Sequence, residues 1–329
     1  MDDADHLQAQ APTSYRAHGK LLLSGEYAVL DGALALALPA RYGQTLVHYP
    51  PENTGFNNQL HWEACDPQHD IWFSTAFQLP GLELKEKNPS DMALRLQGLL
   101  REALRLRPDF SSCMAGKAVS TLEFPRHWGL GSSSTLVSLI AQWSGADAFK
   151  LHEAVWPGGS GFDLACAEAL GPIFYRLSGE LPTWEHIHFH PDFADKLHFV
   201  HQGQKQNTRT AIGQYRRLGL QKRAHLVNEI SEISEALRRS QSLSTFEYLL
   251  QEHERLLGDA LDQTPVQTAR FADFEGIIKS LGAWGGDFML ATGEPDYITG
   301  YFYRHGLREI ITYPGMVRNS ENAPLTDTG

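Results

Sequence analysis

The chain has 329 residues and a mass of 36.7 kDa, which is long for a single core and favours two domains. Its composition, 42% hydrophobic and 20% charged, is that of an ordinary globular protein and argues against a disordered or fibrous chain. The formal net charge of -11 argues against general binding to nucleic acid or to an anionic membrane, because both require a basic surface. An anionic ligand would therefore need basic residues concentrated locally.

The N-terminal segment MDDADHLQAQAPTSYR is acidic and polar, so we expect no secretory signal there and a mobile tail over residues 1–14. The longest nearly apolar stretch, GALALALPA, is far shorter than the roughly 20 residues of a membrane helix. We therefore expect a cytoplasmic protein. Cys65, Cys113 and Cys166 lack paired spacing, which favours buried free thiols over a disulfide framework or a zinc site.

The first half of the chain alternates strands and helices. Residues 17–40 are expected to form a strand, a tight turn and further extended chain. Leucines at helical spacing predict a helix over Ser90–Arg107, capped by Ser90 or Asp91. A strand over residues 117–125 leads into an apolar helix from Ser132 to about Trp143. A short helix, a glycine-rich turn, a second helix from near Gly161 and a strand follow.

The second half has a different order of elements. We expect strands at HIHFH and at LHFVHQG, then two long polar helices between Arg209 and Leu257. A helix over Ala269–Ser280 and strands at DFMLATG and over residues 297–302 complete the chain. Mixed strand and helix order in both halves predicts an α+β fold with domains at 15–180 and 181–329.

The segment PRHWGLGSSST stands directly before the apolar helix. Gly129 and Gly131 allow close backbone approach to a ligand, and the serines begin a helix whose unpaired N–H groups and positive dipole end favour an anion. The alternative is that Ser132 only caps a buried helix. A Walker A loop, a G-x-G-x-x-G fingerprint and a G-x-S-x-G nucleophile elbow are all missing from the sequence, which disfavours a P-loop enzyme and a serine hydrolase.

Two further segments carry charged residues in unusual positions. In GKLLLSGEYAVLDG, Lys20 follows a glycine at the start of a strand, and Glu26 and Tyr27 occupy a turn. In GGSGFDLA, Asp163 lies near the start of a helix between apolar neighbours. Taken singly, these residues are better explained as a solvated strand end, a turn carboxylate and a helix-dipole partner.

Taken together, GKLLLSGEYAVLDG, PRHWGLGSSST and LGAWGGDFMLATG resemble the three motifs of the GHMP kinase superfamily, in the family's order, from about Tyr15 to Tyr313. That superfamily includes galactokinases, homoserine kinases, mevalonate kinases and phosphomevalonate kinases. SGEYAVL, GSGFD and NTRT are most similar to phosphomevalonate kinases. The resemblance implies a ribosomal-protein-S5-like N-terminal domain and a ferredoxin-like C-terminal domain, with ATP and the acceptor meeting between them.

The resemblance also implies roles for individual residues. Asp163 would accept or orient the proton of the acceptor hydroxyl, and Lys20 would stabilise the charge on the transferred phosphoryl group. Mg²⁺ would be held by Ser132 and Glu153. The nucleotide phosphates would be bound by Pro125, Gly129, Leu130, Gly131, Ser132, Ser133 and Ser134. The acceptor would be contacted by Glu26, Tyr27, Gly161, Lys205, Arg209 and Gly285.

The resemblance therefore implies an ATP-dependent and Mg²⁺-dependent kinase acting on a small anionic acceptor, phosphomevalonate or mevalonate. A kinase for another alcohol or a sugar, or a ligand sensor of the same fold without turnover, are the alternatives. Trp284 interrupts the family's C-terminal run of glycines and would narrow the pocket there. The polar helices from Arg209 to Leu257 suit either internal packing or a homodimer.

A second chemistry is suggested by HIHFH. His186, His188 and His190 would lie on one face of a strand and could bind a metal ion. The same alternation is typical of an ordinary half-buried strand.

Overall fold

The computed structural model describes residues 11–179, 181–203, 208–282 and 287–319, which form two compact units. The first unit comprises residues 11–17, Gly43–Pro125 and Ser132–Gly159, and the second comprises His18–Tyr42, Arg126–Gly131 and the described residues from Ser160 onward. The long strands β1 (Thr13–Ser24) and β2 (Ala35–Tyr49) belong to both units, so each unit is discontinuous in sequence. The expected domain boundary after residue 180 stays a prediction, and most of the expected tail lies outside the described residues.

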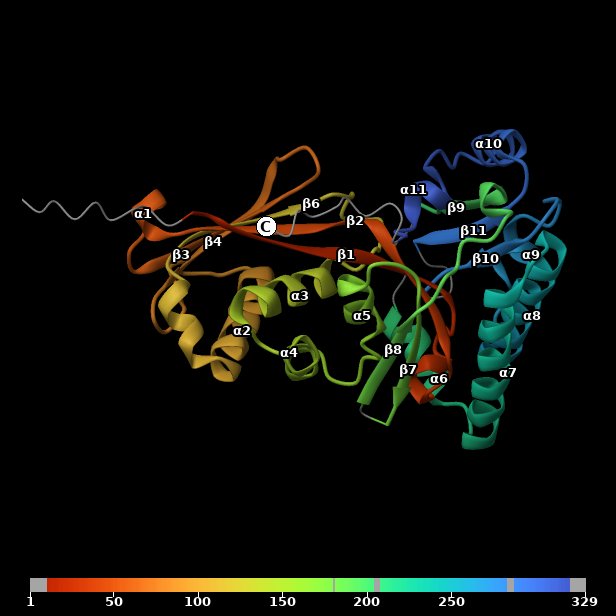
Figure 1. The fold of residues 1–329 in the computed structure, drawn as a ribbon, viewed down its shortest axis with the longest axis horizontal. Helices are drawn as coiled ribbons and strands as arrows, with labels where there is room; N and C mark the ends of the chain where they lie inside the picture. The colour runs from red at the N-terminus through yellow and green to blue at the C-terminus, as the bar shows by residue number, and fades with distance from the viewer. Residues whose placement is uncertain (1–10, 180, 204–207, 283–286, 320–329) are drawn as a thin grey trace, which may run out of the picture. The chain divides into compact units, whose positions relative to one another are not determined.

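The first unit is a sheet with helices on one face (Figure 1). Its elements are α1 (Pro51–Thr54), β3 (Gln59–Cys65), β4 (Ile71–Gln78), β5 (Glu83–Leu84), α2 (Asp91–Leu106), η2 (Pro108–Cys113), β6 (Gly116–Leu122), α3 (Ser132–Ser144) and α4 (Ala148–Val155). The strand order is β5-β4-β3-β6-β2, and β3 pairs with β6 in parallel while the other pairs are antiparallel. The helices α2, α3 and α4 pack against one another below this sheet.

Local sequence explains the helices of this unit. The side chain of Ser90 accepts a hydrogen bond from the backbone N–H of Ala93 at 3.2 Å and caps α2, as the spacing predicts. Leu96, Leu99 and Leu100 lie on the buried face of α2. The predicted apolar helix from Ser132 is also confirmed, because α3 runs to Ser144 and is buried along most of its length.

The second unit contains two separate sets of strands. Its elements are η1 (Ala28–Asp31), α5 (Phe162–Glu168), β7 (Ile173–Ser178), β8 (Leu181–His186), η3 (Ala194–Lys196), β9 (Leu197–His201), α6 (Thr208–Arg216), α7 (Leu220–Arg239), α8 (Leu243–Leu261), α9 (Val266–Arg270), β10 (Ile278–Ser280), β11 (Phe288–Thr292), α10 (Pro295–Arg304), β12 (Ile310–Thr312) and α11 (Tyr313–Met316). The first part of β2 pairs with β7, and β7 pairs with β8. The other set is an antiparallel sheet of order β10-β11-β9-β12.

Two apolar clusters hold this unit together. One joins η1 to α6, α7 and α8 through Tyr27, Tyr215, Ile230 and Leu257. The other joins the antiparallel sheet to α9 and α10, and its members include Val200, Met289, Phe271 and Phe302. Helices α7 and α8 lie side by side along their length (Figure 1).

Most predicted elements are present, and the α+β class is confirmed. The helix expected over Ala269–Ser280 is wrong: α9 ends at Arg270, and Gly276, with φ of 114°, precedes the strand β10. The strand expected over residues 297–302 is also wrong. There Pro295 opens α10, and Ile298, Tyr301 and Phe302 have the i, i+3, i+4 spacing of a buried helix face.

Further differences concern the middle of the chain. The region expected to hold two polar helices contains α6, α7 and α8. The strand expected at HIHFH corresponds to β8, which lies mostly before this segment and ends at its first residue, His186. Ile187 and Phe189 beyond β8 are still buried. Among the described residues, none of the helices combines the length and the apolar composition of a membrane-spanning segment.

Candidate functional site

A loop with two left-handed glycines joins β6 to α3. Gly129 and Gly131 have φ of 66° and 92°, values that glycine adopts at little steric cost. Leu130 between them is 0% exposed and anchors the loop in the second unit. A Cβ at position 129 would overlap the carboxylate of Asp287. The two glycines are therefore required by this backbone path.

Lys20 on β1 binds this loop twice. Its backbone N–H donates to the carbonyl of Leu130 at 3.0 Å, and its ammonium Nζ donates to the carbonyl of Gly129 at 3.1 Å. A Cβ at position 19 would lie 3.0 Å from the Leu130 carbonyl oxygen, so the glycine before Lys20 permits the close approach. The lysine is thus held beside the loop with a half-exposed side chain.

Asp163 lies in the first turn of α5, directly after Phe162, whose ring faces Lys20. The helix starts after Gly161, whose φ is 75°, and an oxygen of Asp163 accepts from the N–H of Leu164 at 3.2 Å. The Nζ of Lys20 is 5.9 Å from the ring centre of Phe162. Burial, followed by the charge of Asp163, raises the pKa of the Cys166 thiol, and the charge of Lys20 opposes that rise. Both charges therefore act on the same thiol.

Tyr175 on β7 holds the start of this helix. Its hydroxyl donates to the backbone carbonyl of Ser160, two residues before Phe162. Burial, followed by the charge of Asp163, raises the pKa of the Tyr175 hydroxyl, so it stays a protonated donor. The position of Asp163 is consequently set by a hydrogen bond to the backbone that precedes α5.

Glu26 belongs to a fully buried cluster of ionisable groups. Its Oε1 lies 2.5 Å from the Nζ of Lys279 on β10, and its Oε2 lies 3.2 Å from the Nε2 of His253 on α8. The same Nζ is 3.8 Å from Oε1 of Glu254 and donates to the carbonyl of Ser280 at 2.8 Å. Glu26 is 1% exposed, and Lys279 and His253 are 0% exposed.

Burial and pairing decide the charges in this cluster. Burial alone would raise the pKa of Glu26, but Lys279 and His253 outweigh it, so this pKa lies below its ordinary value. Burial, followed by the charge of Lys279, lowers the pKa of His253. Burial raises the pKa of Glu254 to about 8. At neutral pH Glu26 is therefore a carboxylate paired with Lys279, and Glu254 is protonated.

Tyr27 next to Glu26 is also a core residue. It is 6% exposed, and its ring stacks on that of Tyr215 at a centroid distance of 6.1 Å. The Tyr215 hydroxyl donates to Asp31 at 2.6 Å, which ties α6 to the turn. Both side chains are enclosed by protein in this structure. Contacts of Glu26 and Tyr27 with an acceptor stay predictions.

The nucleotide and magnesium residues expected in the first unit lie after β6, in the first turn of α3 and in α4. Pro125 is half-buried after β6, Ser132 begins α3, Ser133 is exposed and Ser134 is buried. Glu153 is an exposed residue of α4 whose carboxylate accepts from the N–H of Gly158 at 3.3 Å. Their roles stay predictions.

The remaining expected acceptor residues are only partly described. Gly161 is the buried residue before α5, and Arg209 falls in α6. Lys205 and Gly285 lie outside the described residues, as does Trp284.

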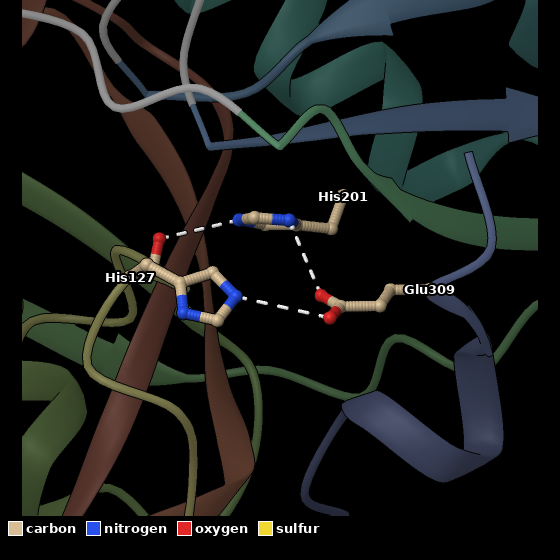
Figure 2. Close-up of side chains that lie close together, drawn as sticks. All are labelled: His127, His201 and Glu309. Carbon is tan, nitrogen blue, oxygen red and sulfur yellow. Dashed lines mark hydrogen bonds and ion pairs between the residues drawn. The ribbon is translucent and has the colours of Figure 1, made fainter. Parts of the chain in front are cut away.

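The three histidines of HIHFH, for which the sequence left open either a metal site or an ordinary half-buried strand, are not the group of ligands that the structure brings together. His186, His188 and His190 are exposed. Within the described ranges, the ligand atoms close enough to share an ion belong to His127, His201 and Glu309, all within 4.8 Å of one another (Figure 2).

Comparison with known proteins gives a likeness of fold. No sequence model of a known family matches the chain, and no curated protein matches it significantly. The Methanococcus jannaschii mevalonate kinase structure is 13% identical, with a TM-score of 0.66 over 91% of this chain and 96% of that one. Lactococcus lactis galactokinase is 14% identical, with a TM-score of 0.67 over 94% and 95%. Streptococcus pneumoniae phosphomevalonate kinase is 16% identical, with a TM-score of 0.64 over 91% and 99%.

The chain has the fold of the GHMP kinases. The superfamily fold implied by the three sequence motifs is therefore confirmed, and it covers more than nine-tenths of the chain in these comparisons. At 13 to 16% identity the likeness concerns the fold and leaves the substrate open.

The sequence analysis missed several partners of the expected residues. Lys279 stands in the mostly apolar segment IIKSLG, a signal of a buried lysine. His253 and Glu254 share the apolar stripe of α8 with Leu250 and Leu257, a spacing that already places them on its buried face. His127 and His201 had no such signal, since their proximity arises only on folding.

Proposed function

We propose that the protein is an ATP-dependent small-molecule kinase that transfers the γ-phosphoryl group to a small anionic acceptor, phosphomevalonate or mevalonate. The observation that carries the proposal is the placement of Lys20, whose Nζ binds the glycine loop at Gly129 and lies 5.9 Å from the ring centre of Phe162, the residue before Asp163. Phosphoryl transfer requires a fixed cation, a loop that binds phosphate and a carboxylate from the protein.

Solved structures of the same fold support the choice of ligands. Streptococcus pneumoniae phosphomevalonate kinase is seen in complex with phosphomevalonate and AMPPNP. L. major mevalonate kinase is seen with R-mevalonate, and Lactococcus lactis galactokinase with galactose. These proteins bind a nucleotide or a small substrate on a shared fold, so we assign ATP and a small acceptor to this chain.

The residues of the loop fit a bound nucleotide and its metal ion. Gly129 and Gly131 have positive φ, and α3 begins directly after the loop with backbone N–H groups that have no partner within the helix. The Ser132 hydroxyl and the Glu153 carboxylate are oxygen donors of the kind Mg²⁺ prefers. When bound, Mg²⁺ neutralises phosphate charge and orients the transferred group.

Lys20 and Asp163 have separate roles in the proposed transfer. Lys20 stabilises negative charge that develops on the transferred group, and its bond to Gly129 keeps it oriented. Asp163 orients an acceptor hydroxyl and accepts its proton late, because a carboxylate is a weak base for an alcohol. A phosphate acceptor needs no proton removed, so with phosphomevalonate the contribution of Lys20 outweighs that of Asp163.

The test measures ADP release with Mg·ATP and, separately, phosphomevalonate, mevalonate, homoserine and galactose. We expect release with one of the first two, lowered about 10²- to 10⁴-fold in D163N when the acceptor is an alcohol. K20M should lower kcat with either acceptor. D259N, at a 71% exposed carboxylate on α8, is the matched control and should retain activity.

The same measurement separates the alternatives. ADP release with galactose or homoserine alone would change the proposed acceptor but support the proposed kinase activity. Binding of ATP without turnover on any acceptor would indicate the sensor. Failure to bind ATP at all would overturn both.

A further inference from the structure

A second group of potential ligands lies beside the glycine loop, in the second unit. His127 comes from the loop, His201 ends β9, and Glu309 directly precedes β12 (Figure 2). The backbone N–H of His201 donates to the carbonyl of Glu309 at 2.9 Å, which fixes these two residues side by side. The Nδ1 of His201 is 3.2 Å from Oε2 of Glu309, and the Nε2 of His127 is 3.7 Å from its Oε1.

Hydrogen bonds fix which nitrogen of His201 faces the carboxylate. Its Nε2 is 3.2 Å from the carbonyl oxygen of His127, and since a carbonyl only accepts, Nε2 carries the proton. The N–H of Gly203 points at Nδ1 at 3.2 Å. In the neutral ring, the Nδ1 lone pair therefore faces a carboxylate oxygen, and a proton or a cation between these two acceptors would stabilise the contact.

The carboxylate is oriented from outside in the same way. The indole Nε1–H of Trp128 donates to Oε2 of Glu309 at 2.7 Å. Orienting hydrogen bonds to both a ligand imidazole and a ligand carboxylate are the usual surroundings of a protein metal site. His201 is almost wholly buried, with a side chain 3% exposed, while His127 is 59% exposed and free to turn toward an ion.

We propose that His127, His201 and Glu309 bind a divalent transition-metal ion of the zinc class. Tetrahedral zinc, with bonds of about 2.0 to 2.1 Å, brings its ligand atoms to roughly 3.4 Å from one another. The present separations, all within 4.8 Å, reach that geometry through movement of the exposed His127 ring. Two imidazoles with one carboxylate favour zinc over Mg²⁺ or Ca²⁺, which prefer oxygen ligands.

The ion would fix the glycine loop at a point outside the nucleotide site. His127 precedes Gly129 by two residues, and the Gly129 carbonyl accepts from Lys20. Binding would therefore tie the start of the loop to β9 and to the segment before β12. The site is separate from the Mg²⁺ assigned to ATP, and its existence does not depend on the proposed kinase activity.

The test uses the full chain without a polyhistidine tag and after treatment with a chelator. Zinc chloride is titrated in competition with a chromophoric chelator, and Co²⁺ replaces zinc to give the visible absorption of a tetrahedral site. We expect one ion per chain. H127A and E309Q should each weaken binding at least about tenfold, as loss of even an orienting partner does.

The matched control is H225A. His225 on α7 is an exposed histidine whose Nδ1 lies 3.8 Å from the Glu229 carboxylate. Among the described residues, no second histidine joins this pair to form a group of three possible ligands. H225A should bind zinc as the wild type does. No stoichiometric zinc binding by the wild type, or equal binding by H127A and E309Q in folded form, would overturn the site and leave only a hydrogen-bonded cluster. Circular dichroism on each variant excludes misfolding.

Discussion

Two clusters in the second unit contain the same histidine–carboxylate contact in different surroundings. His253 and Glu26 are 3.2 Å apart, as are His201 and Glu309. In the first cluster Lys279 supplies the compensating charge, and Glu26 and Lys279 have side chains 1% and 0% exposed. In the second, Glu309 is 44% exposed, and the ion pairs found for it within the described residues are with histidines.

The difference in burial gives the histidine–carboxylate contact a structural role in the Glu26 cluster and a ligand-binding role in the Glu309 cluster. A carboxylate enclosed with an ammonium has no room for another ligand, so the Glu26 cluster joins β10 and α8 to the turn after β1. A carboxylate that faces two imidazoles and water can exchange a proton or water for an ion. Burial decides which cluster is structural and which can bind.

The largest expected effect comes from K279M. Removing the ammonium leaves the Glu26 carboxylate buried without its main partner, and breaking such a pair costs about 3 to 5 kcal/mol of unfolding free energy. Urea denaturation measures it. K196M is the matched control, because the 71% exposed Glu294 makes that pair a surface contact worth at most about 1 kcal/mol. Equal losses in the two variants would remove the distinction between the clusters.

The pH dependence of stability tests the same cluster through Glu254. Its pKa of about 8 lies above the ordinary 4.5, so between these values the folded chain binds more protons than the unfolded chain. Stability from this group is complete below about pH 4.5 and is lost as the pH rises through 8, by a few kcal/mol in all. Lys279 and Glu26 are the charged groups that act on Glu254.

E254Q should remove this loss, because an amide stays neutral and resembles the protonated acid. Unfolding free energies of the variant and the wild type, measured from about pH 5 to pH 9, give the difference. E252Q, at a surface pair with Arg255 on the same helix, is the control and should keep the wild-type slope. Identical slopes in E254Q and the wild type would contradict the assigned protonation.

An intermediate effect is expected in the glycine loop. G129A adds a Cβ at φ of 66° that overlaps the Asp287 carboxylate, so we expect about 1 to 3 kcal/mol of destabilisation and weaker ATP binding. Denaturation and calorimetry measure the two changes. G98A, in the middle of α2 with open space around its Cβ, should instead stabilise by about 0.5 to 1 kcal/mol. A G129A chain as stable as the wild type would show that the loop path is adaptable.

The smallest effect is expected from H127A without metal. The contact with Glu309 is long and exposed, so its loss should change the unfolding free energy by less than about 1 kcal/mol. Zinc at about 100 times its Kd should stabilise the wild type by about 2.7 kcal/mol, and H127A much less. A large loss in the metal-free variant would instead make this cluster structural, like that of Glu26.

Local patterns predicted much of the fold. The helix α2 followed from leucine spacing and the Ser90 cap, and α3 followed from its apolar run. The elements α10 and β10 were misread, because short apolar runs suit either a strand or a helix until their packing is known. The loop, Lys20 and Asp163 were singled out from sequence, since glycines and charges in unusual places are visible there.

By itself the sequence determined the residue types of the candidate site and the α+β class, because capping, periodicity and the three motifs are local or nearly local patterns. Only the tertiary structure decided that Glu26 pairs with Lys279, 253 positions along the chain, and that His127 meets His201 and Glu309. Both clusters depend on contacts between distant segments, whose proximity no local pattern encodes. Burial, which excludes solvent from the Glu26 cluster and leaves Glu309 exposed, is likewise a property of the folded chain.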